Sequence, residues 1–159
     1  MPESIVVSVN PKPGRHFSSA KHVNHLLNAE HLADIQCERT ANIYRLEGEC
    51  EADEIQKICT ELLADPVAET YAVSELPDSA ERIFADVWYK KGVTDSVGES
   101  VVRASRELGV ESLNKAYAGT RYLFRIRTVQ PKQVAEFVSQ NLLNPLVQEC
   151  EIIQRGANS

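Results

Sequence analysis

The chain lacks the features that define several easily recognised classes of protein. Among its 159 residues, no apolar stretch approaches the roughly 20 residues that a transmembrane helix needs. The opening Met-Pro-Glu-Ser-Ile-Val has neither the basic segment nor the apolar run of a signal peptide. Lysine and arginine number 17 against 23 acidic residues, giving a formal net charge of -6, and they form no run. We therefore expect a cytoplasmic protein that binds neither a membrane nor nucleic acid.

Cysteine and histidine do not occur in the spacing of a metal site. The four cysteines are Cys37, Cys50, Cys59 and Cys150, and none forms a Cys-x-x-Cys pair. The four histidines fall between His16 and His31, but His22 and His25 lie on the solvent side of a predicted helix, with no third ligand beside them. We expect no metal, no cofactor, and reduced, mostly buried thiols.

Catalytic motifs are also missing. The sequence has no G-x-S-x-G, no H-E-x-x-H and no P-loop. A Cys-His nucleophile pair is conceivable, but Cys37 falls within a predicted strand and Cys59 on the core-facing stripe of a predicted helix, where thiols are usually inert. We predict no catalytic residues.

An internal repeat is the strongest signal in the sequence. A shift of 78 residues places Lys12-Pro13-Gly14 on Lys90-Lys91-Gly92 and Tyr44-Arg45-Leu46 on Tyr122-Leu123-Phe124. After the third predicted strand the shift becomes 79, and Asp65-Pro66-Val67 then falls on Asn144-Pro145-Leu146. Matches that recur in order indicate a diverged tandem duplication.

Each half has the same pattern of predicted elements, β-α-β-β-α-β. In the first half, strands alternate apolar and polar residues and helices carry an apolar stripe. The expected strands there are Ser4 to Val9, Asp34 to Thr40, Asn42 to Glu47 and Glu69 to Val73, the middle two joined by a tight turn, and the helices are Ser18 to Glu30 and Ala52 to Ala64. The second half is expected to have strands at Arg82 to Tyr89, Ser112 to Ala118, Arg121 to Val129 and Val147 to Ile153, with helices that begin near Thr94 or Asp95 and at Pro131 and that face the core with Val97, Val101, Ala104 and Leu108 and with Val134, Phe137, Val138 and Leu142.

This order predicts an α+β protein of two tandem ferredoxin-like units, each with two helices on one face of an antiparallel sheet. The predicted boundaries are 1–74 for repeat 1, 75–81 for a linker, 82–155 for repeat 2 and 156–159 for a flexible tail. A unit of about 75 residues is marginal alone, so pairing with its twin gives the duplication a physical reason.

Two groups of residues in repeat 2 are candidates for a protein interface. Ile83, Ala85 and Val87 are expected to face the helices, so Phe84 and Trp88 must point to the opposite face, where the other repeat or a second chain would cover them. The other group is Gly92, Asp95 and Gly98, where a helix N-terminus could hold an anion, although a simple turn explains these residues as well.

Repeat 2 resembles the PurS family, the small subunit of phosphoribosylformylglycinamidine synthase. The matching stretches are Lys91-Gly92-Val93-Thr94-Asp95-Ser96-Val97-Gly98, Arg106-Glu107-Leu108-Gly109-Val110, Gly119-Thr120-Arg121-Tyr122-Leu123 and Leu142-Leu143-Asn144-Pro145-Leu146-Val147. Repeat 1 has the same ending, Leu62 to Tyr71, but has Gly14 to Ala20 in place of the Gly-x-x-Asp-x-x-Gly turn. If that turn contacts a partner, repeat 2 is expected to make the contact.

The resemblance implies a non-catalytic subunit or domain. The family's enzyme makes the amidine from formylglycinamide ribonucleotide, glutamine and ATP, and PurS dimers bridge its glutaminase and synthetase parts. The two repeats would then form a pseudo-dimer that scaffolds those parts in purine biosynthesis, and the chain could also form a homo-dimer. A small-molecule regulatory module built on the same fold is the alternative, and an independent enzyme is a third possibility.

Overall fold

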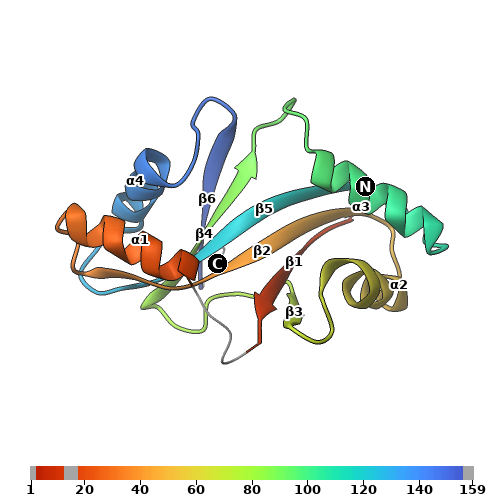
Figure 1. Cartoon of the computed structure of the whole chain (residues 1–159), viewed down its shortest axis with the longest axis horizontal. Helices are drawn as coiled ribbons and strands as arrows, with labels where there is room; N and C mark the ends of the chain where they lie inside the picture. The colour runs from red at the N-terminus through yellow and green to blue at the C-terminus, as the bar shows by residue number, and fades with distance from the viewer. Residues whose placement is uncertain (1–2, 13–17, 156–159) are drawn as a thin grey trace. The chain divides into compact units, whose positions relative to one another are not determined.

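The computed structural model describes residues 3–12 and 18–155, which form a mixed α+β protein (Figure 1). Six strands form one sheet in the order β3-β1-β2-β5-β4-β6. The strands are β1 (Glu3–Pro11), β2 (Ile35–Gly48), β3 (Glu69–Val73), β4 (Arg82–Tyr89), β5 (Leu113–Ile126) and β6 (Gln148–Gln154). The helices are α1 (Ser18–Ala29), α2 (Ala52–Ile58) with a π-helical continuation at Cys59–Leu63, α3 (Ser96–Glu107) and α4 (Pro131–Asn141). The predicted α+β class with an antiparallel sheet is confirmed.

The tight turns predicted inside each repeat are wrong. Asp34 to Glu47 was expected to be two strands, but β2 is one continuous strand of 14 residues, and β5 is equally long. A two-residue hairpin turn needs positive φ at its central positions. Neither the Thr40-Ala41-Asn42 segment nor Gly119 has a positive φ, so the chain continues straight through both positions.

The two compact units of the chain do not follow the two repeats. Unit 1 comprises Met1–Arg15, Asn42–Glu75 and Thr94–Gly119, and unit 2 comprises the remainder. Repeat 1 therefore contributes His16–Ala41 to unit 2, and repeat 2 contributes Thr94–Gly119 to unit 1. The 78-residue shift places one of these segments on the other, so the repeats exchange equivalent helix-and-strand segments, as in domain swapping.

Unit 1 has the ferredoxin-like strand order. It contains β3, β1, the second half of β2 and the first half of β5 as neighbours in that order. Strand β1 is antiparallel to both of its partners, with Val7 opposite Tyr44 on β2 and opposite Val73 on β3. Its core residues come from the strands and from the helices α2 and α3: Val7, Val9, Leu46, Ile58, Cys59, Leu63, Val101, Val110, Leu113 and Ala116.

Unit 2 repeats this arrangement with β6, β4, the second half of β5 and the first half of β2. Strand β4 pairs antiparallel with β6, with Val87 opposite Cys150. Helices α1 and α4 lie side by side on one face of this unit's sheet (Figure 1). Ile83, Ala85 and Val87 pack into the core beneath them, which confirms the predicted face of β4.

Several predicted helix signals are also confirmed. Asp95 caps α3, Gly109 follows that helix with a φ of 90°, and Pro131 opens α4. Val97, however, was expected on the core stripe and is 52% exposed. The buried stripe of α3 runs instead through Gly98, Val101 and Ser105, because the helix approaches β5 at its glycine.

Within residues 3–12 and 18–155, no helix has the length and apolar character that crossing a membrane requires.

Candidate partner-binding site

Asp95 joins helix α3 to strand β5 in unit 1. Its Oδ1 accepts a hydrogen bond of 2.9 Å from the Gly98 backbone N–H, which is an ordinary N-cap. Its Oδ2 accepts a second bond, of 2.7 Å, from the Ala118 N–H on β5. Both carboxylate oxygens are therefore used within unit 1, and the side chain fixes where the helix begins along the strand.

Gly98 lets α3 approach β5 closely. A Cβ built on this residue would lie 2.1 Å from the backbone oxygen of Ala116, a distance that no real side chain reaches. The glycine is buried, and its N–H is the one that Asp95 holds. Packing inside unit 1 thus explains both Asp95 and Gly98, and neither needs a bound anion to account for it.

Gly92 belongs to unit 2, so the predicted Gly-x-x-Asp-x-x-Gly element is divided between the two units. Its φ of 89° is in the left-handed region that favours glycine, and a Cβ there would meet nothing within 4 Å. The turn is closed by a hydrogen bond of 3.1 Å from the Val93 N–H to the Lys90 oxygen. The corresponding Gly14 of repeat 1 lies outside the described residues.

Phe84 and Trp88 are buried within the chain itself, at 1% and 5% exposure. They lie on the face of β4 opposite the helices, as the alternation of the strand predicted. The sequence left open whether the other repeat or a second chain covers these rings, and their burial within this chain leaves almost none of their surface for a second chain. Their large apolar areas stabilise the chain, by roughly 1.5–3 kcal/mol for each fully buried aromatic side chain.

A buried ion pair on the same face was not recognised in the sequence. Asp86 is 0% exposed, and its carboxylate accepts hydrogen bonds of 2.8 and 2.9 Å from the Arg121 guanidinium. The same guanidinium lies over the Phe84 ring, 4.3 Å from its centroid. An aspartate between two aromatic residues on an apolar strand was the available signal. A buried carboxylate needs a partner, and the planar fork of arginine fits it best.

The side chain of Asn24 was also overlooked. In unit 2 its amide both donates to the Cys37 oxygen, at 2.8 Å, and accepts from the Cys37 N–H, at 2.7 Å. The pairing of β1 with β2 ends at Asn42, so β1 does not reach the part of β2 that contains Cys37. Asn24 therefore satisfies the backbone edge of β2 in unit 2, much as Asp95 does for β5 in unit 1.

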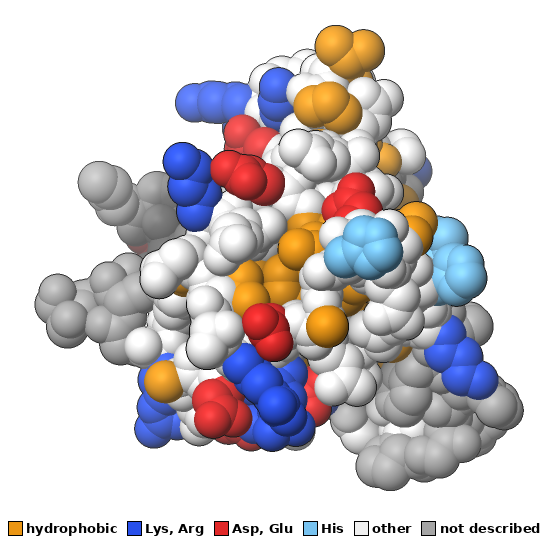
Figure 2. All heavy atoms as spheres, turned by 90° about the vertical axis from the view of Figure 1, so that its left-hand side faces the viewer, with side chains coloured by type: hydrophobic (Ala, Val, Ile, Leu, Met, Phe, Trp, Pro, Cys, Tyr) orange, Lys and Arg blue, Asp and Glu red, His pale blue; other side chains and the backbone are white. Residues whose placement is uncertain are grey.

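Burial makes three of the four thiols poor nucleophiles. Burial raises the pKa of Cys37 to about 12, and burial raises those of Cys59 and Cys150 to about 11. These groups are therefore protonated near neutral pH, whereas a nucleophilic cysteine needs a lowered pKa. His22 and His25 are exposed on α1, as predicted. Figure 2, which views the side of the molecule that is on the left in Figure 1, shows histidine side chains in pale blue on the surface. His16 lies outside the described residues, and the remainder has no cluster of three metal-ligating side chains.

Comparison with known proteins finds a family match for the second half of the chain. The strand order and helices of each unit define a ferredoxin-like α+β fold. Residues 82–155 match the model of the PurS family, described as phosphoribosylformylglycinamidine (FGAM) synthase. The match covers repeat 2, which is thereby similar to a PurS domain. No curated protein matches the chain.

Proposed function

We propose that the chain is a non-catalytic scaffold of FGAM synthase in cytoplasmic purine biosynthesis, bridging the glutaminase and synthetase parts of that enzyme. The observation that carries the proposal is the PurS family match over residues 82–155. We include repeat 1 in the proposal, because its elements correspond to those of repeat 2 and each compact unit contains segments of both repeats.

The chemistry of the described side chains supports a scaffold over a catalyst. The Cys37, Cys59 and Cys150 thiols have raised pKa values, which disfavours the thiolate that a glutaminase nucleophile must supply. The buried charges of Asp86 and Arg121 neutralise each other. In this proposal the partners supply the reactive groups, and the chain supplies the surface that holds them together.

Size-exclusion chromatography of a mixture with both partner components tests the proposal. The purified chain is combined with glutaminase and synthetase components, in the presence and absence of glutamine and ATP. Co-elution of all three, in at least one nucleotide condition, is the expected result. If the chain elutes alone in every condition, the scaffold proposal fails, and the small-molecule regulatory module becomes the better hypothesis.

A further inference from the structure

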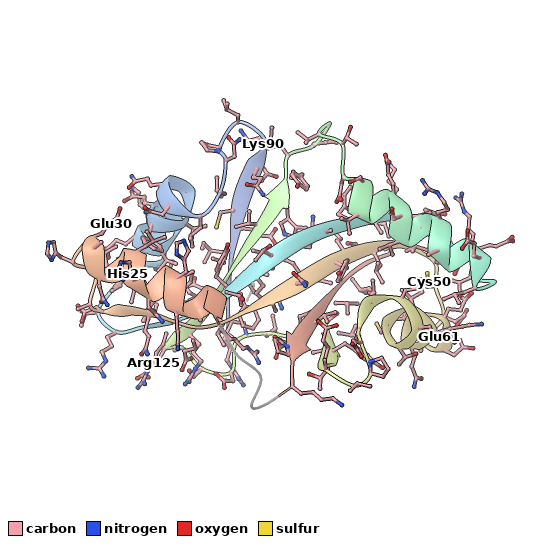
Figure 3. All side chains as sticks on the ribbon, viewed as in Figure 1. His25, Glu30, Cys50, Glu61, Lys90 and Arg125 are labelled. Carbon is pink, nitrogen blue, oxygen red and sulfur yellow. The ribbon has the colours of Figure 1, made fainter. Side chains whose placement is uncertain are left out.

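Strand β6 is a terminal strand of the sheet, with β4 as its neighbour (Figure 1). The register of the two strands pairs Tyr89 with Gln148. One step further, the Lys90 N–H at the end of β4 (Figure 3) donates to the Val147 oxygen at 2.8 Å. Because antiparallel pairs are alternately hydrogen bonded and not hydrogen bonded, three residues of β6 direct their backbone N–H and C=O groups away from β4: Cys150, Ile152 and Gln154. No hydrogen bond among residues 3–12 and 18–155 uses these outward groups.

The edge of β6 lacks the features by which native proteins commonly keep an edge strand from pairing. Those features are a very short strand, a lysine, a proline or a bulge. Strand β6 has 7 residues, none of them lysine, proline or glycine, and its register with β4 is unbroken. The other terminal strand, β3, has 5 residues and is followed by Ser74 with a φ of 54°. Of the two edges of the sheet, the edge at β6 is therefore the more open to a further strand.

A second copy of β6 matches this edge when the two strands run antiparallel about a two-fold axis at Ile152. Ile152 then lies opposite Ile152 of the second copy, and Cys150 lies opposite Gln154 of the second copy. Every residue with outward backbone groups thereby gains a hydrogen-bonded partner. Cys150 and Ile152 pack against the core beneath the helices, so the alternating side chains of Glu149 and Glu151 lie on the opposite face of the strand.

The charges along β6 favour the same register. With the axis at Ile152, the exposed Glu149 lies opposite Arg155 of the second copy, and the two-fold symmetry repeats this pair at the other end. Arg155 is also exposed, and its guanidinium donates to the Asp78 oxygen at 3.0 Å. Opposite charges directly across two strands are stabilising, and like charges there are destabilising. An axis at Glu151 would place two copies of that carboxylate opposite each other, so the glutamates disfavour that register.

We propose that two copies of the chain associate by antiparallel pairing of their β6 strands about a two-fold axis at Ile152. The sheet of unit 2 in one copy continues into that of the other, and Glu149 of each copy pairs with Arg155 of the other. A single pair of strands buries little surface, so the association is reversible and its extent rises with protein concentration. The dimer uses an edge that the exchange of segments between the repeats leaves open, and it does not depend on the scaffold function.

Sedimentation velocity of the full chain over a concentration series tests the inference. Wild type should change from one chain to two as its concentration rises. Arg155→Glu and Glu149→Arg each place like charges opposite each other at both ends of the strand pair, and each should raise the dimer dissociation constant at least about tenfold. The double variant restores opposite charges and should dimerise as wild type does. Arg127→Glu makes the same change of net charge at an exposed residue outside β6 and should leave the dissociation constant unchanged.

Proline substitutions test the backbone pairing separately. Gln154→Pro removes an N–H that points to the second copy and none that β4 receives, so it should weaken the dimer while the chain stays folded by circular dichroism. Val73→Pro makes the equivalent change at the outer edge of β3 and should dimerise as wild type does. If Gln154→Pro fails to fold, the charge variants decide. A wild type that remains a single chain throughout the series overturns the proposal, as does a dimer that the charge reversals leave unchanged.

Discussion

The start of helix α3 shows how single residues determine the spacing between a helix and a strand. Gly98 is unfavourable in a helix by about 1 kcal/mol relative to alanine, so propensity alone predicts that Gly98→Ala stabilises the protein. The Ala116 oxygen, 2.1 Å from the position of the new Cβ, opposes that gain. The backbone atom cannot rotate away as a flexible side chain would, and the steric effect should therefore be the larger of the two.

We expect Gly98→Ala to lower the free energy of unfolding by about 1–3 kcal/mol, the usual cost of overpacking. Urea denaturation measures it. Val97→Ala, at an exposed position of the same helix, is the matched control and should change stability by less than about 0.5 kcal/mol. A Gly98→Ala protein more stable than wild type would show that α3 does not approach β5 as described.

The buried thiols predict a loss of stability at high pH. Burial raises the pKa of Cys37 from 9.0 to about 12 and that of Cys59 from 9.0 to about 11. Above pH 9 the unfolded chain releases these protons while the folded chain keeps them, so unfolding becomes more favourable as the pH rises. The stabilisation is complete below pH 9 and is lost progressively towards pH 11–12.

The measurement compares wild type with the Cys37→Ala, Cys59→Ala double variant at pH 8 and pH 10.5. The variant is less stable at pH 8 because of its cavities, but it should lose less stability between the two pH values, by an amount of order 1–3 kcal/mol. Equal losses in the two proteins would mean that these thiols titrate normally.

At the scale of the element, periodicity predicted most helices and strands, because alternation and helical spacing are local properties. Four helix positions, the face of β4, the Asp95 cap and the stop at Gly109 all followed from the sequence and are confirmed. The continuity of β2 and β5 did not follow from the sequence, because one long strand and a two-stranded hairpin have the same alternation of apolar and polar residues. Which of the two forms depends on pairing with strands of the other repeat.

Polar contacts across elements were also beyond local reasoning. Asp86 with Arg121 and Asn24 with Cys37 are separated by 35 and 13 residues, and no short motif connects them. Phe84 and Trp88 were placed on the correct face, but the sequence left open whether the other repeat or a second chain would cover them, and the structure buries them within the chain. Each of the two polar pairs lies within one repeat, but its members belong to different elements that only the folded sheet and its helices bring together.

The Asn24 contact makes a prediction about the edge of β2. Asn24→Ala removes both partners of the buried Cys37 backbone, and the unsatisfied groups should cost about 1–3 kcal/mol. Amide exchange at Cys37 should accelerate. Asn28→Ala, one turn later on the exposed side of α1, is the control, with an expected change below about 0.5 kcal/mol. Equal effects of the two substitutions would contradict the role of Asn24.

At the scale of the whole molecule, each compact unit needs segments of both repeats. Repeat 2 alone would have β4, β6, α4 and the second half of β5, but it would lack His16–Ala41, which completes unit 2. Its own Thr94–Gly119 is equivalent to that segment. Two copies of repeat 2 could therefore complete each other by the same exchange.

We expect a fragment of residues 76–155 to fold as a dimer. Its unfolding midpoint should rise with protein concentration, since folding and association are coupled. Sedimentation equilibrium measures the mass, and the full chain, in which the repeats are linked, should show no such coupling within the units. A folded monomeric fragment would mean that the chain can reverse at Gly119 and that the exchange is optional.

The proposed scaffold function depends on partners, so the most direct measurement is glutamine-dependent FGAM formation by reconstituted components. Formylglycinamide ribonucleotide, ATP and glutamine are supplied to the glutaminase and synthetase components, and the chain is titrated in. The account predicts that activity rises with added chain and saturates at a fixed ratio, while the chain alone gives none. Activity that is the same with and without the chain, at component concentrations that allow assembly, would contradict it.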